Sequence, residues 1–333
     1  MTVAIVFAGQ GAHRDGMASA WRNHRSYATF AEVGRVCGLP DLARLADDPS
    51  ACAATAVAQP AVFAAGLATW RALIDVGVEP SALAGHSLGE VTAAVAAGSL
   101  SVRDGAALVA ERGRAFSAAC TRNPGTMTAV LGLDPPVVEE ALVSVEGVTV
   151  ANDNAPGQTV IAGPPQAVDD AAAACRAAGG RVRALDVEGA FHTTAMAPAI
   201  VRVAAILRRL DVTDPKAPLV TGATADVART AVEVRRGIVD GVLAPVRWRE
   251  VQSRLVELGA DVIVEAGPGV LRALARRTVP EVTAVSADSP ETVRQVAAKL
   301  MLGGRPPART APEVAGRSAE DDATARLIEV QAR

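Results

Sequence analysis

Gly85-His86-Ser87-Leu88-Gly89 is the stretch of sequence that decides the fold. The apolar run Ser81 to Ala84 before it predicts a short strand, and the Ala-rich stretch Val91 to Gly98 after it predicts a helix. A G-x-S-x-G pattern between a strand and a helix is typical of a nucleophile elbow, because the glycines permit a sharp turn that exposes the serine hydroxyl at the carboxyl edge of a sheet. The pattern also occurs in ordinary Gly-rich turns, so the serine's partners decide between the two interpretations.

A serine hydroxyl needs a nearby base to act as a nucleophile at neutral pH, and the chain has four histidines. His86 should point away from the hydroxyl across the turn. His13 and His24 lie in a polar N-terminal stretch that nothing ties to the elbow. His192 is left, on a loop after the alternating run Arg181 to Val187, and it is our candidate base. On this pattern alone, an ordinary surface histidine is the alternative.

Short apolar runs separated by helical patterns predict a mostly parallel sheet with helices on both faces. These runs are Val3 to Ala8, Ser81 to Ala84, Leu219 to Thr221 and Val262 to Glu265. Between them, a different order predicts a ferredoxin-like βαββαβ motif. Its elements are strand Met127 to Leu131, helix Pro136 to Ser144, strand Val148 to Ala151, strand Thr159 to Ala162, helix Pro165 to Ala178 and strand Arg181 to Val187.

We therefore expect an α/β protein with two subdomains and an active site in the cleft between them. The large, α/β-hydrolase-like subdomain takes residues 1–124 and 188–303, and the inserted ferredoxin-like subdomain takes residues 125–187. Residues 304–333 begin with Gly304-Arg305-Pro306-Pro307 and predict a disordered C-terminal tail with a weak helix from Ala319 to Gln331.

Composition excludes several classes of function. A net charge of −3 gives no electrostatic reason to bind nucleic acid, and aromatic residues at 3% offer few stacking platforms for bases. The four cysteines have no metal-ligand spacing and predict reduced, structural thiols. The chain starts in a strand without a basic leader, and no uninterrupted apolar stretch is long enough to span a bilayer, so we expect a cytoplasmic protein with no membrane partner.

Six blocks carry a resemblance over about the first 300 positions. The chain resembles malonyl-CoA:acyl carrier protein transacylases and the related acyltransferase domains of polyketide synthases. In the family's order the blocks are Phe7-Ala8-Gly9-Gln10-Gly11, Gly85 to Glu90, Glu111-Arg112-Gly113-Arg114, Asn152 to Gln158, Gly189-Ala190-Phe191-His192-Thr193 and Glu265-Ala266-Gly267-Pro268-Gly269.

The resemblance implies a role for most of these residues. Ser87 would attack a thioester carbonyl, and His192 would take its proton and later activate the acceptor thiol. The backbone N–H groups of Gln10 and Leu88 would bind the oxyanion. Arg112, which on spacing alone is a solvated helical arginine, would pair with the free carboxylate of malonyl through two parallel hydrogen bonds.

His86 and Phe191 are further substrate-binding candidates. In the family, a bulky aromatic at the position of Phe191 accompanies malonyl, whereas a Tyr-Ala-Ser-His sequence accompanies methylmalonyl; one methyl group against an apolar wall is worth only about 1–3 kcal/mol. The block Asn152 to Gln158 has the composition of a hairpin turn, and the resemblance places Asn154 near the cleft.

Two departures from the family's pattern concern the turn and the histidine. Ala8 stands where proline is common, which loosens the turn before Gln10. Gly241 stands where the family has a glutamine whose backbone carbonyl orients the catalytic histidine. A carbonyl can come from any residue, so function should survive, but the group that orients His192 is the weakest part of the assignment.

The resemblance implies an acyltransferase that moves malonyl from malonyl-CoA to the phosphopantetheine thiol of an acyl carrier protein, in fatty acid or polyketide biosynthesis. Coenzyme A thioester and phosphopantetheine are then substrates, with no bound cofactor or metal, and the usual state is a monomer. Three alternatives stay open: a trans-acting acyltransferase with another extender or a carrier-bound donor, a thioester hydrolase with the same Ser87 and His192, and a noncatalytic binding subunit.

Overall fold

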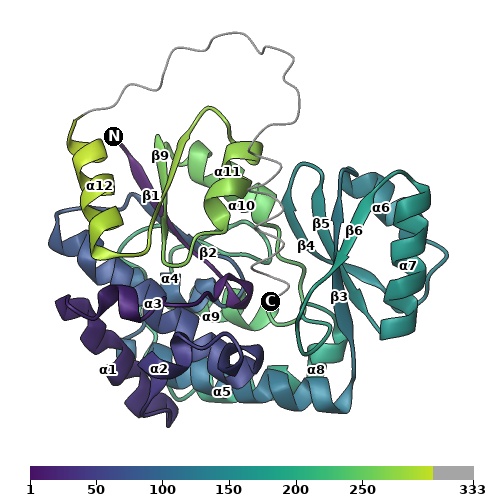
Figure 1. Ribbon diagram of the computed structural model, residues 1–333, viewed down its shortest axis with the longest axis horizontal. Coiled ribbons are helices and arrows are strands. Elements are labelled where there is room, and N and C mark those ends of the chain that lie inside the picture. The colour runs from purple at the N-terminus through teal and green to yellow at the C-terminus, as the bar shows by residue number, and fades with distance from the viewer. Residues whose placement is uncertain (303–333) are drawn as a thin grey trace.

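The computed structural model describes residues 1–302 and contains two separate sheets (Figure 1). The larger sheet has the strand order β10-β9-β1-β2-β7-β8, and only β8 runs antiparallel to its neighbour. Its strands are β1 Val3–Phe7, β2 Ala82–Gly85, β7 Leu219–Val220, β8 Val227–Ala228, β9 Val262–Ala266 and β10 Thr283–Ala287. The sequence predicted four of these strands. It missed β8, which has two residues, and β10, whose Thr283 and Ser286 interrupt the apolar pattern.

Helices cover both faces of this sheet, so β1, β2 and β9 are buried at every position. Ile5 and Phe7 of β1 belong to the core cluster that includes α3, α4 and α5, whereas Ala4 and Val6 belong to the cluster with α10 and α11. The helices are α1 Ala28–Cys37, α2 Leu42–Ala46, α3 Thr55–Asp75, α4 Gly89–Ala96, α5 Val102–Arg122, α8 Ala197–Leu207, α9 Ala231–Asp240, α10 Trp248–Glu257, α11 Leu271–Thr278 and α12 Pro290–Met301. Short 3-10 helices lie at η1 Gln10–Ala12, η2 Ser19–Trp21, η3 Arg25–Tyr27, η4 Ala51–Ala53 and η5 Thr194–Met196.

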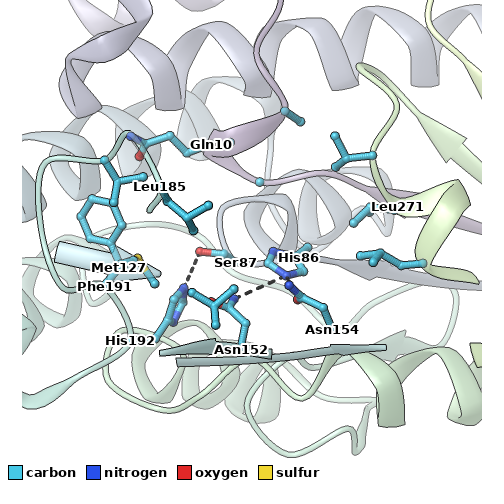
Figure 2. Close-up of a pocket in the computed structure, with 17 residues that line it drawn as sticks. Gln10, His86, Ser87, Met127, Asn152, Asn154, Leu185, Phe191, His192 and Leu271 are labelled. Atoms are coloured by element: carbon cyan, nitrogen blue, oxygen red, sulfur yellow. Dashed lines mark hydrogen bonds between the residues drawn. The ribbon is translucent and has the colours of Figure 1, made fainter. Parts of the chain in front are cut away.

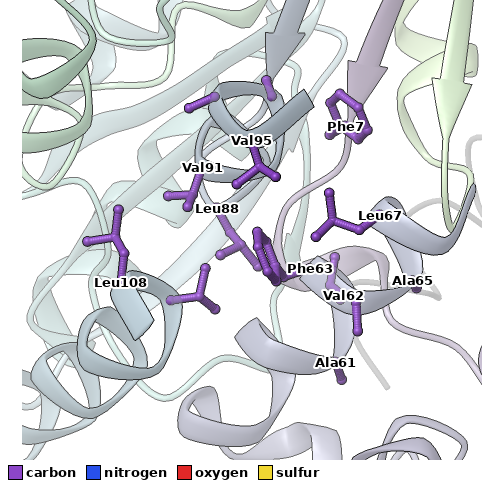
Figure 3. Close-up of a cluster of buried hydrophobic side chains, with 14 of the residues drawn as sticks. Phe7, Ala61, Val62, Phe63, Ala65, Leu67, Leu88, Val91, Val95 and Leu108 are labelled. Atoms are coloured by element: carbon purple, nitrogen blue, oxygen red, sulfur yellow. The ribbon is translucent and has the colours of Figure 1, made fainter. Parts of the chain in front are cut away.

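The core behind α4 is packed with apolar side chains (Figure 3). Leu88 and Val91 meet Phe63 of α3 and Leu108 of α5 in one buried cluster. This packing holds in place the helix that follows the candidate nucleophile, so the backbone of the elbow is rigid.

The smaller sheet stands to one side of the large one in Figure 1 and has the order β4-β5-β3-β6. All its pairs are antiparallel, and α6 and α7 pack against it. The elements are β3 Thr126–Leu131, α6 Pro135–Leu142, β4 Thr149–Ala155, β5 Gln158–Gly163, α7 Pro165–Ala177 and β6 Arg181–Ala184. This arrangement confirms the predicted α/β class with an inserted ferredoxin-like motif. The boundaries of the two subdomains stay a prediction, and the predicted tail lies outside the described residues.

The expectation of a turn over the whole block Asn152 to Gln158 was wrong. Asn152 to Ala155 continue β4, and the turn is confined to Pro156 and Gly157. The polar side chains fit a strand because Asn152 and Asn154 are buried beside the cleft. Turn composition alone does not reveal such partners.

Strand β4 also ties the small sheet to the large layer. The Asp153 N–H donates to the Val246 carbonyl, and the Val246 N–H donates to the Ala151 carbonyl, both at 2.9 Å. Arg249 of α10 adds two hydrogen bonds to Asp153 Oδ2 at 2.9 and 2.7 Å. The segment that precedes α10 therefore belongs to the large subdomain and is hydrogen-bonded to β4 of the small sheet.

Among residues 1–302, α3 is the one helix with the length and apolar composition to cross a membrane. Of its most apolar window, 78% is buried inside the fold, as in the core helix of a globular domain. The four cysteines are also buried and unpaired. Burial raises the pKa of Cys37 to about 11 and of Cys52 to about 12, so both thiols are protonated and unreactive at neutral pH.

Candidate active site

The elbow forms where β2 ends at Gly85 and α4 begins at Gly89. Ser87 between them has φ of 53°, the left-handed region that costs a non-glycine residue about 1–3 kcal/mol. The two glycines are required by close approach. A Cβ on Gly85 would lie 1.9 Å from the Gly89 carbonyl carbon, and one on Gly89 would lie 2.1 Å from the Phe7 carbonyl oxygen.

His192 meets Ser87 in the cleft, with Nε2 2.8 Å from Oγ (Figure 2). Its Nδ1 lies 3.2 Å from the Ala244 carbonyl oxygen. A carbonyl only accepts, so Nδ1 carries the proton, and Nε2 is left as the acceptor for the serine hydroxyl. His192 itself has φ of 59°, so both members of the pair hold strained backbones.

The group that orients His192 differs from the expectation. The sequence placed it at Gly241, but the hydrogen bond goes to Ala244, in the loop that leaves α9. Gly241 caps the end of α9, and its carbonyl has only a smaller influence on the imidazole. The sequence does not reveal which carbonyl of this loop points toward His192.

Burial above all, together with the positive charge of Arg112 and the neighbouring His86, lowers the pKa of His192 to about 3. The carbonyls of Ala244 and Gly241 oppose this effect. The imidazole is consequently neutral at physiological pH, which is the form that can accept a proton from Ser87.

Gln10 and Leu88 lie at the carboxyl ends of neighbouring strands, because Phe7 of β1 pairs in register with Gly85 of β2. Within residues 1–302, their backbone N–H groups donate no hydrogen bond. The Gln10 side chain is held elsewhere, since its Nε2 donates to Thr55 Oγ1 at 2.9 Å. Two unused amides beside the serine suit an oxyanion site, and that role stays a prediction.

Arg112 is buried on α5, with only 4% of its surface exposed. Its Nη2 donates to Ser87 Oγ at 3.2 Å, and its Nη1 donates to Gln59 Oε1 at 2.8 Å. The guanidinium carbon lies 4.1 Å from the centre of the Phe116 ring. Burial lowers its pKa to about 10, so it remains a cation at neutral pH. The solvated alternative considered from the sequence was therefore wrong.

Sequence reasoning missed Gln59 and Phe116, which hold this cation. Gln59 is fully buried, and its Nε2 has no hydrogen-bond partner among residues 1–302. A lone glutamine in the apolar helix α3, just before Pro60, was the available signal. Phe116 also packs against Phe191, with ring centres 5.6 Å apart, so one aromatic supports both candidate substrate contacts.

The cleft around Ser87 has an empty volume of about 710 Å³, part of it open to solvent. Its apolar wall includes Met127, Phe191 and Leu271 (Figure 2). In residues 1–302, no group of three or more histidine, cysteine or acidic side chains could hold a metal ion.

His86 lines the cleft but points away from the serine hydroxyl, as expected (Figure 2). Its Nε2 lies 2.9 Å from Asn154 Oδ1 and 3.5 Å from Asn152 Nδ2. The shorter distance indicates that Nε2–H donates to Asn154, since the same nitrogen cannot also accept from Asn152. The ring packs edge-on to Trp248. His86 thus links the elbow to β4, and burial lowers its pKa.

The sixth block of the resemblance, which begins at Glu265, supports the part of the cleft wall that Val270 and Leu271 line. Glu265 Oε1 accepts from the N–H groups of Val270 and Leu271, each at 2.6 Å, and Oε2 accepts from Arg272 N at 2.9 Å. These bonds fix the start of α11 against the cleft. The role of the block is therefore positional.

Comparisons with known proteins agree with this geometry. The family model described as "Acyl transferase domain" matches residues 4–293. The malonyl CoA-acyl carrier protein transacylase of Salmonella typhimurium is 34% identical over 296 residues, which cover 86% of this chain and 96% of that protein. The chain belongs to the malonyl CoA-acyl carrier protein transacylase family.

Solved structures of the transacylase family share the fold. One is a malonyl-transacylase in complex with its type II PKS acyl-carrier protein; it has a TM-score of 0.86 and 33% identity, covering 90% of this chain and 100% of that chain. Another is the transacylase of Xanthomonas oryzae pv. oryzae, with a TM-score of 0.85 and 36% identity, covering 90% and 99%. The resemblance inferred from the sequence is confirmed.

Proposed function

We propose that this chain transfers a malonyl group from malonyl-CoA to the phosphopantetheine thiol of an acyl carrier protein, with Ser87 carrying the acyl group between them. The supporting observation is the buried Arg112 guanidinium, whose Nη2 lies 3.2 Å from Ser87 Oγ. A cation there would hold the free carboxylate of malonyl beside its reacting carbonyl. The names of the relatives support the same donor and acceptor.

The first half-reaction forms the acyl-enzyme. His192 Nε2 accepts the Ser87 proton as Oγ attacks the thioester carbonyl. The oxyanion accepts hydrogen bonds from the backbone N–H groups of Gln10 and Leu88, each worth about 3 kcal/mol of barrier in comparable acyl enzymes. As the C–S bond breaks, the imidazolium gives its proton to the departing coenzyme A thiolate, and His192 returns to its neutral form.

The second half-reaction runs the same steps toward the carrier. Neutral His192 takes the proton of the phosphopantetheine thiol, and the thiolate attacks the Ser87 ester carbonyl. The C–O bond breaks, and the proton on His192 returns to Ser87 Oγ. Each half-reaction needs one base and one oxyanion site, so a single constellation serves both.

The side chains around Ser87 determine which acyl-CoA donor is preferred. Arg112 favours donors with a free carboxylate, and Phe191, held by Phe116, fills space beside it. This arrangement favours malonyl over methylmalonyl by the limited amount that one methyl group allows, about 1–3 kcal/mol.

Intact-protein mass spectrometry tests the proposal directly. Wild type, Ser87→Ala and Arg112→Gln would be incubated briefly with malonyl-, methylmalonyl- or acetyl-CoA, with and without phosphopantetheinylated carrier protein. We expect a malonyl adduct on wild type alone, discharged only when carrier is present. An adduct that disappears equally fast without carrier would identify a hydrolase. The absence of an adduct from every donor would overturn the hypothesis that coenzyme A thioesters are the acyl donors.

We further propose a monomeric, cytoplasmic enzyme that serves fatty acid or polyketide biosynthesis. The solved complex of a neighbour with its acyl carrier protein supports a carrier as the macromolecular partner. Sedimentation analysis with and without carrier tests the monomer.

A further inference from the structure

Glu90 is a buried carboxyl that the mechanism above does not use. It lies in the first turn of α4, three residues after Ser87, with 4% of its surface exposed. Its Oε2 accepts a hydrogen bond from the Gly222 N–H at 3.1 Å. Its Oε1 has no hydrogen-bond partner within residues 1–302. A buried acidic group with half of its acceptors unused is costly to keep, so the fold gains something from its presence.

Three glycines shape the space around this carboxyl. A Cβ on Gly237 would lie 2.7 Å from Oε1, and a Cβ on Gly222 would lie 3.2 Å from Oε2. A Cβ on Gly241 would lie 3.7 Å from Oε2. Gly237 lies in the last turn of α9, Gly241 is the C-cap residue of that helix, and Gly222 follows β7. The carboxyl thus contacts two elements that lie far from α4 in the sequence.

These two elements hold the two ends of the loop that carries Ala244. Gly241 is the residue where the loop leaves α9. At the other end, the Arg247 N–H donates to the Gly222 carbonyl at 2.9 Å. The loop's hydrogen bond to the reacting groups comes from the Ala244 carbonyl, which lies 3.2 Å from His192 Nδ1, and the Gly241 carbonyl has a smaller influence on the same imidazole. Glu90 therefore connects the nucleophile's helix to the loop that orients the base.

We propose that Glu90 is a positioning residue, which braces loop 241–247 so that the Ala244 carbonyl keeps the Nδ1–H tautomer of His192. The inference rests on the proposed function, since the tautomer matters for Ser87 activation. Glu90 does not touch the substrate. Its structural route to the chemistry runs through Gly222, Gly241 and Ala244, and its charge also acts on Arg112.

The charge state of Glu90 is compatible with this role. Burial raises its pKa to about 7; the Gly222 N–H and the Arg112 cation oppose the increase, and Asp240 adds to it. A brace needs an acceptor for the Gly222 N–H in either protonation state. Glutamine keeps that acceptor and the shape of the side chain, whereas alanine removes both.

Imidazole ¹⁵N NMR reads the tautomer without any need for turnover. With only four histidines, the His192 resonances can be assigned by comparison with His192→Gln. We expect wild type and Glu90→Gln to show a protonated Nδ1 and an unprotonated Nε2. Glu90→Ala should show mixed tautomers. It should also lower kcat for malonyl transfer roughly 10- to 100-fold, while KM for malonyl-CoA stays within about twofold, as expected when only transition-state positioning is lost.

The matched control is Glu233→Ala, which removes the capping box at the far end of α9. It should lower the melting temperature and leave the His192 tautomer and kcat unchanged. If Glu90→Ala folds poorly, Glu90→Asp, which withdraws the carboxylate by one methylene, provides the same test. A wild-type tautomer in Glu90→Ala and Glu90→Asp, or an equal change in Glu233→Ala, would overturn the inference. If wild type shows no malonyl transfer at all, the proposed function fails while the tautomer result still stands.

Discussion

The Nη2 of Arg112 lies 3.2 Å from the Ser87 Oγ, so the cation that would bind the substrate carboxylate already contacts the nucleophile. The same charge lowers the pKa of His192. The free site therefore keeps its base neutral but weak. A carboxylate that pairs with Arg112 would offset this charge and strengthen the base at the moment the donor binds.

Loss of the Arg112 cation should change donor selectivity more than overall reactivity. For Arg112→Gln we expect kcat/KM for malonyl-CoA to fall about 100- to 1000-fold, the cost of leaving one carboxylate unpaired in a buried site. Acetyl-CoA, which has no carboxylate, should change less than tenfold by the same reasoning. Steady-state kinetics with both donors measures this.

Arg112→Lys is the matched control for that experiment. It keeps the charge and loses the fork that Gln59 and Phe116 hold. We expect an intermediate loss with malonyl-CoA. An equal decrease for malonyl and acetyl donors in Arg112→Gln would show that Arg112 supports the fold rather than selection.

Malonate should raise the pKa of His192. Binding of its carboxylate to Arg112 offsets the positive charge that helps to lower this pKa. Burial, which is the larger cause, remains. Imidazole ¹⁵N NMR titration of Ser87→Ala, with and without saturating malonate, measures the shift. Acetamide, which has no charge, is the control ligand and should leave the titration unchanged. A His192 pKa that does not respond to malonate would disprove the coupling.

Sequence patterns predicted the parts of this site that depend on local geometry. The elbow at Ser87 needs glycines within four positions, and the loop of His192 follows a visible strand, so both could be recognised. Gln59 could not be assigned, because its partner Arg112 lies 53 positions away and helix periodicity indicates burial, not contacts. The Ala244 carbonyl was missed for a related reason. A backbone acceptor carries no side-chain signal, and only the path of loop 241–247 determines which carbonyl faces His192.

The fold shows the same division. The repeated βαββαβ order was readable because each apolar run is followed by a turn signal. Strand β8 could not be predicted from the sequence, because Val227 and Ala228 form a strand only by pairing with β7 across a turn. Polar Asn152 and Asn154 resembled turn residues until tertiary partners placed them in β4.

Stability should depend on pH in opposite ways through Glu90 and His192. The pKa of Glu90 is raised from 4.5 to about 7, so the folded state binds more protons in that range and this contribution falls as pH rises. The pKa of His192 is lowered from 6.5 to about 3, so its contribution falls as pH decreases from 6.5. The two slopes oppose each other between pH 4.5 and 6.5.

Two variants separate the slopes by differential scanning calorimetry. The melting temperature of Glu90→Gln minus that of wild type should increase by several degrees from pH 4.5 to 7, because the variant no longer pays to ionise a buried carboxyl. The melting temperature of His192→Gln minus that of wild type should increase as pH falls below 6.5, because the variant lacks the buried imidazole that resists protonation. Differences that do not vary with pH would mean that neither group titrates abnormally.

Strain at Ser87 should be measurable as a gain in stability when function is removed. Its φ of 53° suits glycine, so Ser87→Gly should be more stable than Ser87→Ala by about 1 kcal/mol. Both variants lose the hydroxyl and its bonds to His192 and Arg112, so the comparison cancels those losses. Urea denaturation of the two variants provides the free energies of unfolding. Equal stabilities would mean that the backbone at the elbow relaxes without cost, and the geometry of the half-buried serine would then depend on the glycines at 85 and 89 alone.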